Sequence, residues 1–218
     1  MSENKPITRL LQRAALELWD GCYVNLGIGL PSQVLGFVDP NIFPFIHSEN
    51  GVLGIGQQAP REQMNPMLID AGGAYVSTVN GASFFDSAIS FGMIRSQRLD
   101  LCMLGAFEVD ASGDLANWKI PGKFIPGIGG AMELAQSTKK LIVLTTHQDK
   151  YGVSKIKKTC TLPLTAKHCV NRIISDCAVI DVTEQGLLVR EIAEGLSKAQ
   201  LIEITDAELH FADDIREF

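Results

Sequence analysis

Cys22-Tyr23-Val24-Asn25-Leu26-Gly27-Ile28-Gly29-Leu30-Pro31-Ser32 is the stretch that decides the fold. Its first five residues form a short apolar run that is typical of a buried strand. Glycines then turn the chain, and Pro31 or Ser32 starts a helix, because proline suits the first helical turn. The segment 8–19 precedes this unit, and its apolar side chains recur on one helical face. The sequence therefore predicts a helix, a strand, a turn and a second helix in succession.

The same alternation of short apolar strands and helical stretches continues along the chain and indicates an α/β fold. It is typical of a largely parallel open sheet with helices on both faces, whose ligand sites lie beyond the carboxyl ends of the strands. We expect a single domain over residues 1–218, with a peripheral tail after about residue 205 and a hairpin at Gln185-Gly186. Further strands are expected at 43–47, 75–79, 99–104, 141–145 and 178–182, and helices at 83–95, 130–137, 165–175 and 197–204.

Composition limits the classes of function. The chain has 218 residues, of which 46% are hydrophobic, so it can bury a full core, and its net charge of −6 argues against nucleic-acid binding. Its one basic cluster, Lys155, Lys157 and Lys158, is interpreted as a solvated edge, with a binding patch as the alternative. Residues 1–6 are polar and lack a secretory signal, and the uncharged stretches are too short to span a bilayer. We therefore expect a cytoplasmic protein that binds neither nucleic acid nor membrane.

Cysteine and histidine spacing gives no sign of a metal centre. The five cysteines form no C-x-x-C pair and mostly fall inside apolar runs, as buried free thiols do. The four histidines also lack the paired spacing that is typical of metal ligands. We predict neither a disulfide framework nor a metal site.

Glu49 is the residue that points most clearly at chemistry. It lies in His47-Ser48-Glu49-Asn50-Gly51-Val52-Leu53-Gly54, a glycine-rich turn directly after the apolar run 42–46. A carboxylate at the exit of a buried strand, on backbone that Asn-Gly turns sharply, is held where a substrate can reach it. The residues alone leave two interpretations, a rigidly placed nucleophile and a solvated glutamate in a turn.

A second glycine-rich segment, Gly127-Ile128-Gly129-Gly130-Ala131-Met132, leads into the helix expected at 130. Backbone N–H groups at a helix start lack helical partners and favour negative charge, so they could serve as oxyanion donors, with a tight turn as the alternative. A P-loop motif is missing, and Ser32 occupies the third glycine position of a dinucleotide fingerprint that would begin at Gly27. We therefore do not expect NAD.

Taken together, several segments resemble the β subunit of the 3-oxoacid CoA-transferases, the family of the succinyl-CoA:3-oxoacid and acetate/acetoacetate CoA-transferases. The likeness runs from about residue 8 to residue 205 and implies the CoA-transferase fold, which is similar to that of sugar isomerases. The matching segments are 24–31 as quoted above, Ser48-Glu49-Asn50-Gly51, Gly81-Ala82-Ser83-Phe84-Phe85-Asp86-Ser87, Leu115-Ala116-Asn117-Trp118 with Ile120-Pro121-Gly122-Lys123, 127–132, and Cys160-Thr161-Leu162-Pro163-Leu164-Thr165.

By this resemblance Glu49 is the catalytic glutamate, which attacks an acyl-CoA and carries CoA as a glutamyl thioester in a ping-pong cycle. Coenzyme A is then a substrate and a covalent intermediate, and no permanently bound cofactor is expected. The resemblance implies a role in the metabolism of ketone bodies or short-chain fatty acids. The other site residues that it implies are Gly129, Gly130 and Ala131 around the oxyanion, and Asn25, Asn50 and Asn117 beside the acyl and CoA groups. Asn25 and Asn117 have turn-stabilising roles as their alternative.

Family members of this length are half-enzymes, so the resemblance also implies an obligate α subunit and an α2β2 assembly. Four departures concern acyl specificity. His47 stands where many members have Gln, and Gly73 stands where the mitochondrial type has Lys. Thr146 stands where glutamate commonly precedes the histidine, and many members have Ile-Arg-Gly-Gly-His in place of Ile94-Arg95-Ser96-Gln97-Arg98. Two other functions remain as alternatives, acyl-CoA hydrolysis on the same scaffold and a non-catalytic ligand-binding subunit.

Overall fold

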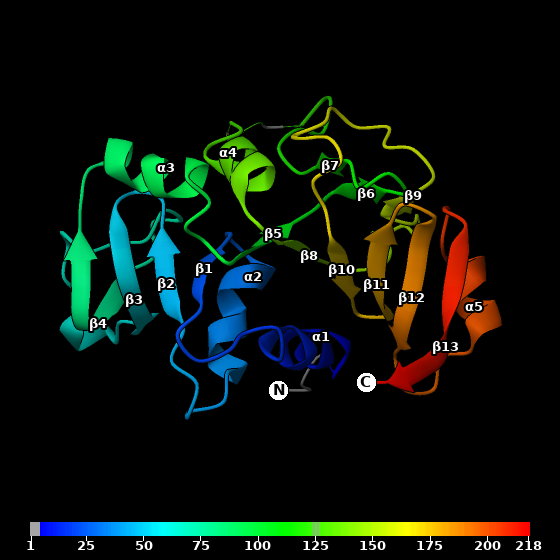
Figure 1. Cartoon of the computed structure of the whole chain (residues 1–218), viewed down its shortest axis with the longest axis horizontal. Helices are drawn as coiled ribbons and strands as arrows, with labels where there is room; N and C mark the ends of the chain where they lie inside the picture. The colour runs from blue at the N-terminus through cyan, green and yellow to red at the C-terminus, as the bar shows by residue number, and fades with distance from the viewer. Residues whose placement is uncertain (1–4, 124, 126) are drawn as a thin grey trace.

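A ten-stranded sheet forms the centre of the computed structural model, which describes residues 5–123, 125 and 127–218 (Figure 1). In space the strands follow the order β13-β12-β11-β10-β8-β5-β1-β2-β3-β4, and five of the nine pairs are parallel. The α/β fold with a largely parallel sheet is thus confirmed. The strand bounds are β1 Tyr23–Leu26, β2 Phe45–Ser48, β3 Val52–Gln58, β4 Val76–Phe84, β5 Leu101–Gly105, β8 Leu141–Thr145, β10 Arg172–Ser175, β11 Ala178–Thr183, β12 Gly186–Ile192 and β13 Leu209–Glu217.

Helices and a second, three-stranded sheet cover the two faces of the large sheet. One face carries α1 (Lys5–Ala15) and α2 (Leu30–Gln33), followed by the 3₁₀ turn Val34–Phe37; a second such turn spans Arg61–Gln63. The other face carries α3 (Ser87–Arg95), α4 (Ala131–Ser137) and the small sheet of β7 (Leu115–Ala116), β6 (Glu108–Asp110) and β9 (Ile156–Lys157). Helix α5 (Lys198–Glu203) packs near β13 (Figure 1). Within the described residues, no helix combines the length and the apolar content that crossing a bilayer requires.

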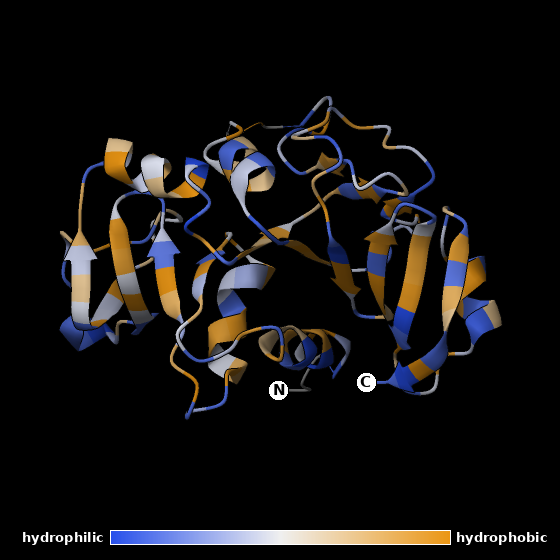
Figure 2. Ribbon diagram, viewed as in Figure 1, coloured by the Kyte–Doolittle hydropathy of each residue, from blue (hydrophilic) through white to orange (hydrophobic). Residues whose placement is uncertain are grey.

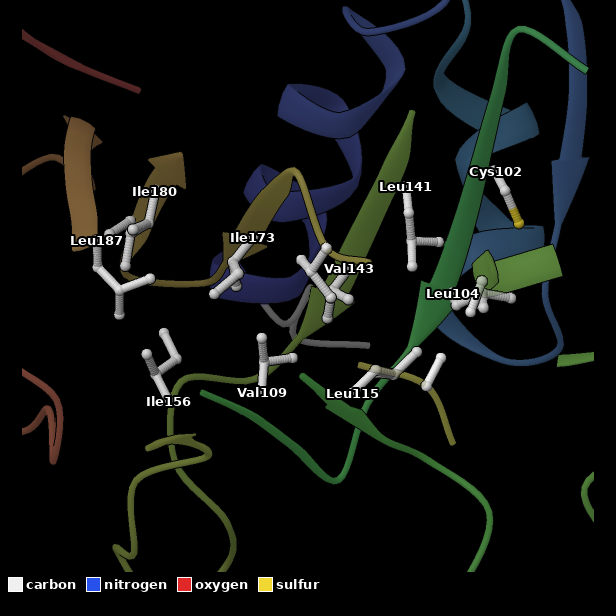
Figure 3. Close-up of a cluster of buried hydrophobic side chains, with 14 of the residues drawn as sticks. Cys102, Leu104, Val109, Leu115, Leu141, Val143, Ile156, Ile173, Ile180 and Leu187 are labelled. Carbon is white, nitrogen blue, oxygen red and sulfur yellow. The ribbon is translucent and has the colours of Figure 1, made fainter. Parts of the chain in front are cut away.

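The middle strands are apolar along their whole length because both of their faces are buried. In β5, Cys102 and Leu104 pack into the core under α3, α4 and the small sheet, whereas Leu101 and Met103 pack into the core under α1. Side chains alternate across a strand, so a continuous apolar run supplies both cores. Figure 3 shows Cys102 and Leu104 with other side chains of the first core, and Figure 2 shows the hydrophobic colour of these strands.

Most predicted elements are present, with shifted ends. The hairpin at Gln185-Gly186 is confirmed as the antiparallel β11–β12 pair, and β8 occupies the predicted range 141–145. Helix α3 starts at Ser87 rather than 83, because Asp86 Oδ1 accepts a hydrogen bond from the Ile89 N–H at 2.8 Å and caps the helix there. Helix α1 begins at Lys5 and ends at Ala15, four residues before the predicted end at 19.

The helix predicted at 165–175 is wrong. Residues 172–175 form β10, which pairs with β8 in parallel, and the Thr165 N–H donates to the Leu115 carbonyl O at 2.7 Å. The spacing of the apolar residues Val170, Ile173 and Ile174 fits a helical period. They are all β-branched, however, and pairing with the open edge of β8 decides their conformation.

Candidate active site

Two cavities lie where neighbouring parallel strands end. Thr145, Gly105, Gly27 and Glu49 stand at or just beyond the carboxyl ends of β8, β5, β1 and β2, and each lines at least one cavity. The cavity volumes are about 480 and 530 Å³. This is the edge at which open α/β sheets bind ligands.

Glu49 stands at the junction of the two cavities. Only Glu49, Gly27, Ile28 and Ala71 among the described residues line both. The first cavity combines apolar walls with the amide side chains of Gln33, Gln57 and Gln58, and the second combines apolar walls with glycines, Asn117, Thr145, Thr146 and Lys155. A ligand whose two arms meet at Glu49 would therefore extend one arm into each cavity.

The turn that carries Glu49 requires glycine at position 51. The Gly51 N–H donates to the Ser48 carbonyl O at 3.0 Å, and the Gly51 carbonyl O accepts from the Phe85 N–H at 3.0 Å. The φ angle of Gly51 is 118°, and a Cβ at this position would overlap the Phe85 carbonyl O. The close approach of the chain at Phe85 therefore fixes the backbone on which Glu49 stands.

Asn25 holds the Glu49 carboxylate from the adjacent strand β1. Its side chain is 1% exposed, and its Nδ2 donates to Glu49 Oε2 at 3.1 Å. The same Nδ2 lies 3.2 Å from the His47 carbonyl O and 3.2 Å from His47 Nδ1. One amide group thus connects the carboxylate to both the backbone and the side chain of β2, and the structure brings these two predicted residues together.

His47 is buried behind Asn25, and its neighbours suit the neutral ring. His47 Nε2 lies 3.0 Å from Ser90 Oγ, while Nδ1 faces the amide donor of Asn25. Burial lowers the pKa of His47 to about 4. With its proton on Nε2 the ring donates to Ser90 and accepts from Asn25, whereas a second proton on Nδ1 would face another donor.

We predict that acid destabilises the fold between about pH 6.5 and pH 4 through His47 and His147. His147 is also buried, lies 3.0 Å from Ser175 Oγ and 2.8 Å from Thr205 Oγ1, and has a pKa lowered by burial to about 4. The unfolded chain takes up these protons near pH 6.5, but the folded chain does not until about pH 4. Above pH 6.5 the two neutral histidines therefore cost the fold nothing. As the pH decreases to 4, the free energy of unfolding falls by about 3 kcal/mol per histidine.

Urea unfolding at stepped pH measures this effect. The variant His47→Gln keeps an amide that can pair with Asn25 and Ser90, and it should lose stability less steeply than the wild type over this pH range. An unchanged pH dependence in His47→Gln would contradict the role given to His47.

Gly130 brings the start of α4 against the Glu49 side chain. A Cβ on Gly130 would lie 3.3 Å from Glu49 Cγ and 3.2 Å from Phe91 Cζ. The backbone at Gly130 can therefore approach these two side chains closely only because glycine has no side chain. The Ala131 N–H makes a long bond of 3.3 Å to the Ile128 carbonyl O, whereas the Gly130 N–H has no acceptor among the described residues. Gly129 lines the second cavity with them. The predicted glycine segment is therefore next to Glu49.

The other two predicted asparagines have different positions. Asn117 lines the second cavity, but its Nδ2 donates to the Gly105 carbonyl O at 3.1 Å and its Oδ1 accepts from Thr165 Oγ1 at 2.6 Å. Asn50 adjoins Glu49 in the turn, yet it is absent from both cavity linings, and its Nδ2 donates to the Ile69 carbonyl O at 2.7 Å. Both amides therefore hold loops of the site in place.

Sequence reasoning missed Lys155, Ile28 and Ala71. Lys155 is half-buried and lines the second cavity, so its interpretation as part of a solvated edge is wrong. The available signal was its place directly before Ile156, a fully buried residue of the short strand β9. Ile28 is 73% exposed although it lines both cavities, and the Ala71 N–H donates to Ser48 Oγ at 2.9 Å beside Glu49.

Comparison with known proteins identifies the family of this chain. The model of the coenzyme A transferase family matches residues 7–203. A succinyl-CoA:3-ketoacid coenzyme A transferase subunit of Helicobacter pylori (strain ATCC 700392 / 26695) is 49% identical over 199 residues, which are 91% of this chain and 96% of that protein. The beta subunit of a probable coenzyme A transferase of Bacillus subtilis (strain 168) is 45% identical, over 92% of this chain and 93% of its own length.

The crystal structure of the acyl-CoA transferase apoenzyme from Escherichia coli O157:H7 has the same fold, with a TM-score of 0.75 and 23% identity. The match covers 96% of this chain and 42% of that one, so this chain spans less than half of the solved enzyme. The family match over nearly the whole length and the relatives at 45% and 49% identity lead to one conclusion. This chain belongs to the coenzyme A transferase family, and these two relatives, which it matches over nearly their full length, are single subunits of such enzymes.

Proposed function

We propose that this chain is the subunit that carries the nucleophile of a CoA-transferase, which moves CoA from an acyl-CoA to a short-chain carboxylic acid, with a 3-oxoacid as one partner. The observation that carries the proposal is the place of the Glu49 carboxylate, held by Asn25 at the junction of two cavities. A thioester carbonyl has two substituents, an acyl chain and a CoA arm. A carboxylate between two cavities suits attack on such a group, because each substituent then has a cavity of its own.

The chemistry needs only the carboxylate and the CoA thiol. Glu49 attacks the thioester carbonyl, the CoA thiolate leaves, and an acyl-glutamyl anhydride forms. The thiolate then attacks the glutamyl carbonyl, the first acid leaves as its carboxylate, and CoA remains on Glu49 as a thioester. A second carboxylate reverses both steps, leaves as the new acyl-CoA and restores Glu49. Activation is conserved throughout, and no water is consumed.

Each tetrahedral intermediate in this sequence carries an oxyanion. The Gly130 N–H, which has no acceptor among the described residues, and the loosely bonded Ala131 N–H lie at the start of α4 beside Glu49. Preorganised donors of this kind stabilise such an oxyanion, and one donor is worth roughly 10²–10³ in rate. We assign these two groups to the oxyanion, with Gly129 giving the loop its shape through a φ of 55°.

The exposed side of the site argues for a partner subunit. Glu49 is only half-buried, and Ile28, which lines both cavities, is 73% exposed. An anhydride or thioester on Glu49 would hydrolyse if water had free access. We therefore infer that an α subunit covers this edge, and that αβ units pair into α2β2.

We predict that the purified chain alone has little transferase activity, although it contains the proposed nucleophile. Addition of its α subunit should restore turnover, because the covered site excludes water and gains the rest of the substrate pocket. The measurement is CoA transfer to acetoacetate with and without the α chain, at equal concentration of this chain. Full turnover by this chain alone would contradict the division of labour.

Trapping of the intermediate tests the proposed function itself. The αβ complex is incubated with an acyl-CoA, treated with borohydride and digested for mass spectrometry. Reduction of a glutamyl-CoA thioester should convert the Glu49 side chain to an alcohol, and Glu49→Gln should show no such product. Absence of the alcohol from an active wild-type complex would overturn the proposal. Release of free CoA without any acceptor acid would favour acyl-CoA hydrolysis.

A further inference from the structure

Lys155 is a cation of the second cavity that the proposed reaction leaves without a role. Its Nζ lies 2.7 Å from Thr146 Oγ1 and 3.4 Å from Thr145 Oγ1. Thr146 Oγ1 donates to the Gln148 carbonyl O at 2.8 Å, and Thr145 Oγ1 donates to the Ala106 carbonyl O at 3.1 Å. Because both hydroxyl protons are used in this way, the two oxygens accept from the ammonium group, which keeps one further N–H to donate.

The charge of Lys155 is not neutralised by an ion pair. Among the described residues, no carboxylate oxygen lies within 4.0 Å of its Nζ. Burial lowers the pKa of Lys155, and the charges of Asp149 and Asp176, which make no ion-pair contact with it, partly oppose this shift. The comparable half-buried cations Arg13, Lys140 and Arg172 each contact a carboxylate at 2.6 to 2.8 Å. A half-buried ammonium group that contacts no carboxylate and keeps one N–H free at a cavity wall suits a site for an anion or a strong acceptor.

The second cavity therefore has charge of opposite sign at two places. Glu49 and Lys155 are its only charged lining residues in the described part of the chain. Apolar side chains, among them Leu104, Leu134 and Leu144, together with glycines, form much of the remaining wall. A short acyl chain suits this lining if its reacting carboxyl is at Glu49 and an oxygen on its remote part reaches Lys155.

We propose that Lys155 selects acyl groups that carry an oxygen function beyond the reacting carboxyl, either a 3-oxo group or a second carboxylate. The inference rests on the function proposed for Glu49. It assigns the second cavity to the acyl group, and the first cavity, with the amides of Gln33, Gln57 and Gln58, to the amide-containing arm of CoA. The two acyl sources share one chemistry, an oxygen that accepts a hydrogen bond from a cation.

Acceptor kinetics of the αβ complex with Lys155→Met separate these sources. Methionine has a similar length but no charge and no N–H. The acceptors are acetoacetate, succinate and butyrate, which share a four-carbon chain, and the donor is acetyl-CoA throughout. In a ping-pong cycle, kcat/KM of the acceptor reports only its reaction with the enzyme-bound CoA, so the donor half-reaction does not contribute.

We expect Lys155→Met to lower kcat/KM for the oxygenated acceptor about 10-fold to 100-fold, the range for a hydrogen bond to a charged group, with less than about threefold change for butyrate. A loss for acetoacetate alone identifies the 3-oxo group, and a loss for succinate alone identifies a carboxylate; either result supports the proposal. Lys157→Met is the matched control, because Lys157 lies two residues on and lines neither cavity. In Lys157→Met, the ratios of kcat/KM among the three acceptors should stay at their wild-type values.

Equal losses for all three acceptors in Lys155→Met would overturn the proposal, since they would place Lys155 at the CoA phosphates or in the scaffold. Unchanged ratios would overturn it as well. If Lys155→Met does not assemble, Thr146→Val removes the hydroxyl that holds the ammonium group and should shift the same ratios in the same direction. If the wild-type complex transfers CoA through the Glu49 thioester but Lys155→Met does not change the ratios as expected, only the role of Lys155 is refuted. A wild-type complex without the thioester refutes the proposed function itself.

Discussion

Replacing Glu49 by glutamine is expected to lower CoA transfer by the αβ complex at least about 10⁴-fold, because the amide keeps the shape of the side chain but is not a nucleophile. The Asn25 amide can still pair with the glutamine carbonyl, so the melting temperature should stay near that of the wild type. Steady-state transfer from succinyl-CoA to acetoacetate provides the measurement. Glu62→Gln is a suitable control, because Glu62 is exposed and lines neither cavity.

Glu49→Asp should lose less, about 100-fold, for a geometric reason. The shorter side chain withdraws the carboxylate by one methylene from the position that Asn25 Nδ2 defines at 3.1 Å, and a displacement of about 1 Å can cost 10²-fold in rate. The order wild type, Asp, Gln is therefore part of the expectation. Turnover at the wild-type rate in either variant would remove Glu49 from the reaction.

Replacing Gly51 by alanine should produce the second large effect, a loss of about 3 kcal/mol or more in the free energy of unfolding. Two causes add: the φ of 118° strains any side chain, and the new Cβ would overlap the Phe85 carbonyl O. The turn that carries Glu49 must then shift, so activity should fall as well. Urea unfolding and the rate of CoA transfer would be measured on the same preparation.

Gly21→Ala separates the two causes. Gly21 has a φ of 76°, but a Cβ there would meet nothing within 4 Å, so only backbone strain of about 1–2 kcal/mol is expected. Equal losses in both variants would show that the close approach at Phe85 contributes nothing.

The sequence was informative about Glu49 because its signal is local. An apolar run followed by Ser-Glu-Asn-Gly predicts both a buried strand and a sharp turn after it, and the structure has both features. The glycine segment before α4 gave an equally local signal at Gly130. That these two segments approach within contact distance is not local information, and only the resemblance to a family implied it.

Lys155 and β10 show where local patterns mislead. A lysine in a basic cluster is usually solvated, and only the packing of Ile156 against the large sheet draws Lys155 into a cavity wall. The residues of β10 have an apolar spacing that fits a helix, but pairing with β8, about thirty residues earlier in the chain, determines their structure. In both cases the decisive partner is remote in sequence, so a window along the chain does not contain it.

The alternation of side chains along β5 has a consequence for local unfolding of the protein. Successive side chains of this strand enter opposite cores, Leu101 on one side and Cys102 on the other, so neither layer can loosen while the other stays packed. We therefore expect the two layers to unfold as one cooperative unit, with the strand ends beneath the carboxylate as a rigid part of it. Movements that admit substrate and release product must then belong to the loops above those strand ends and to whatever subunit closes over them.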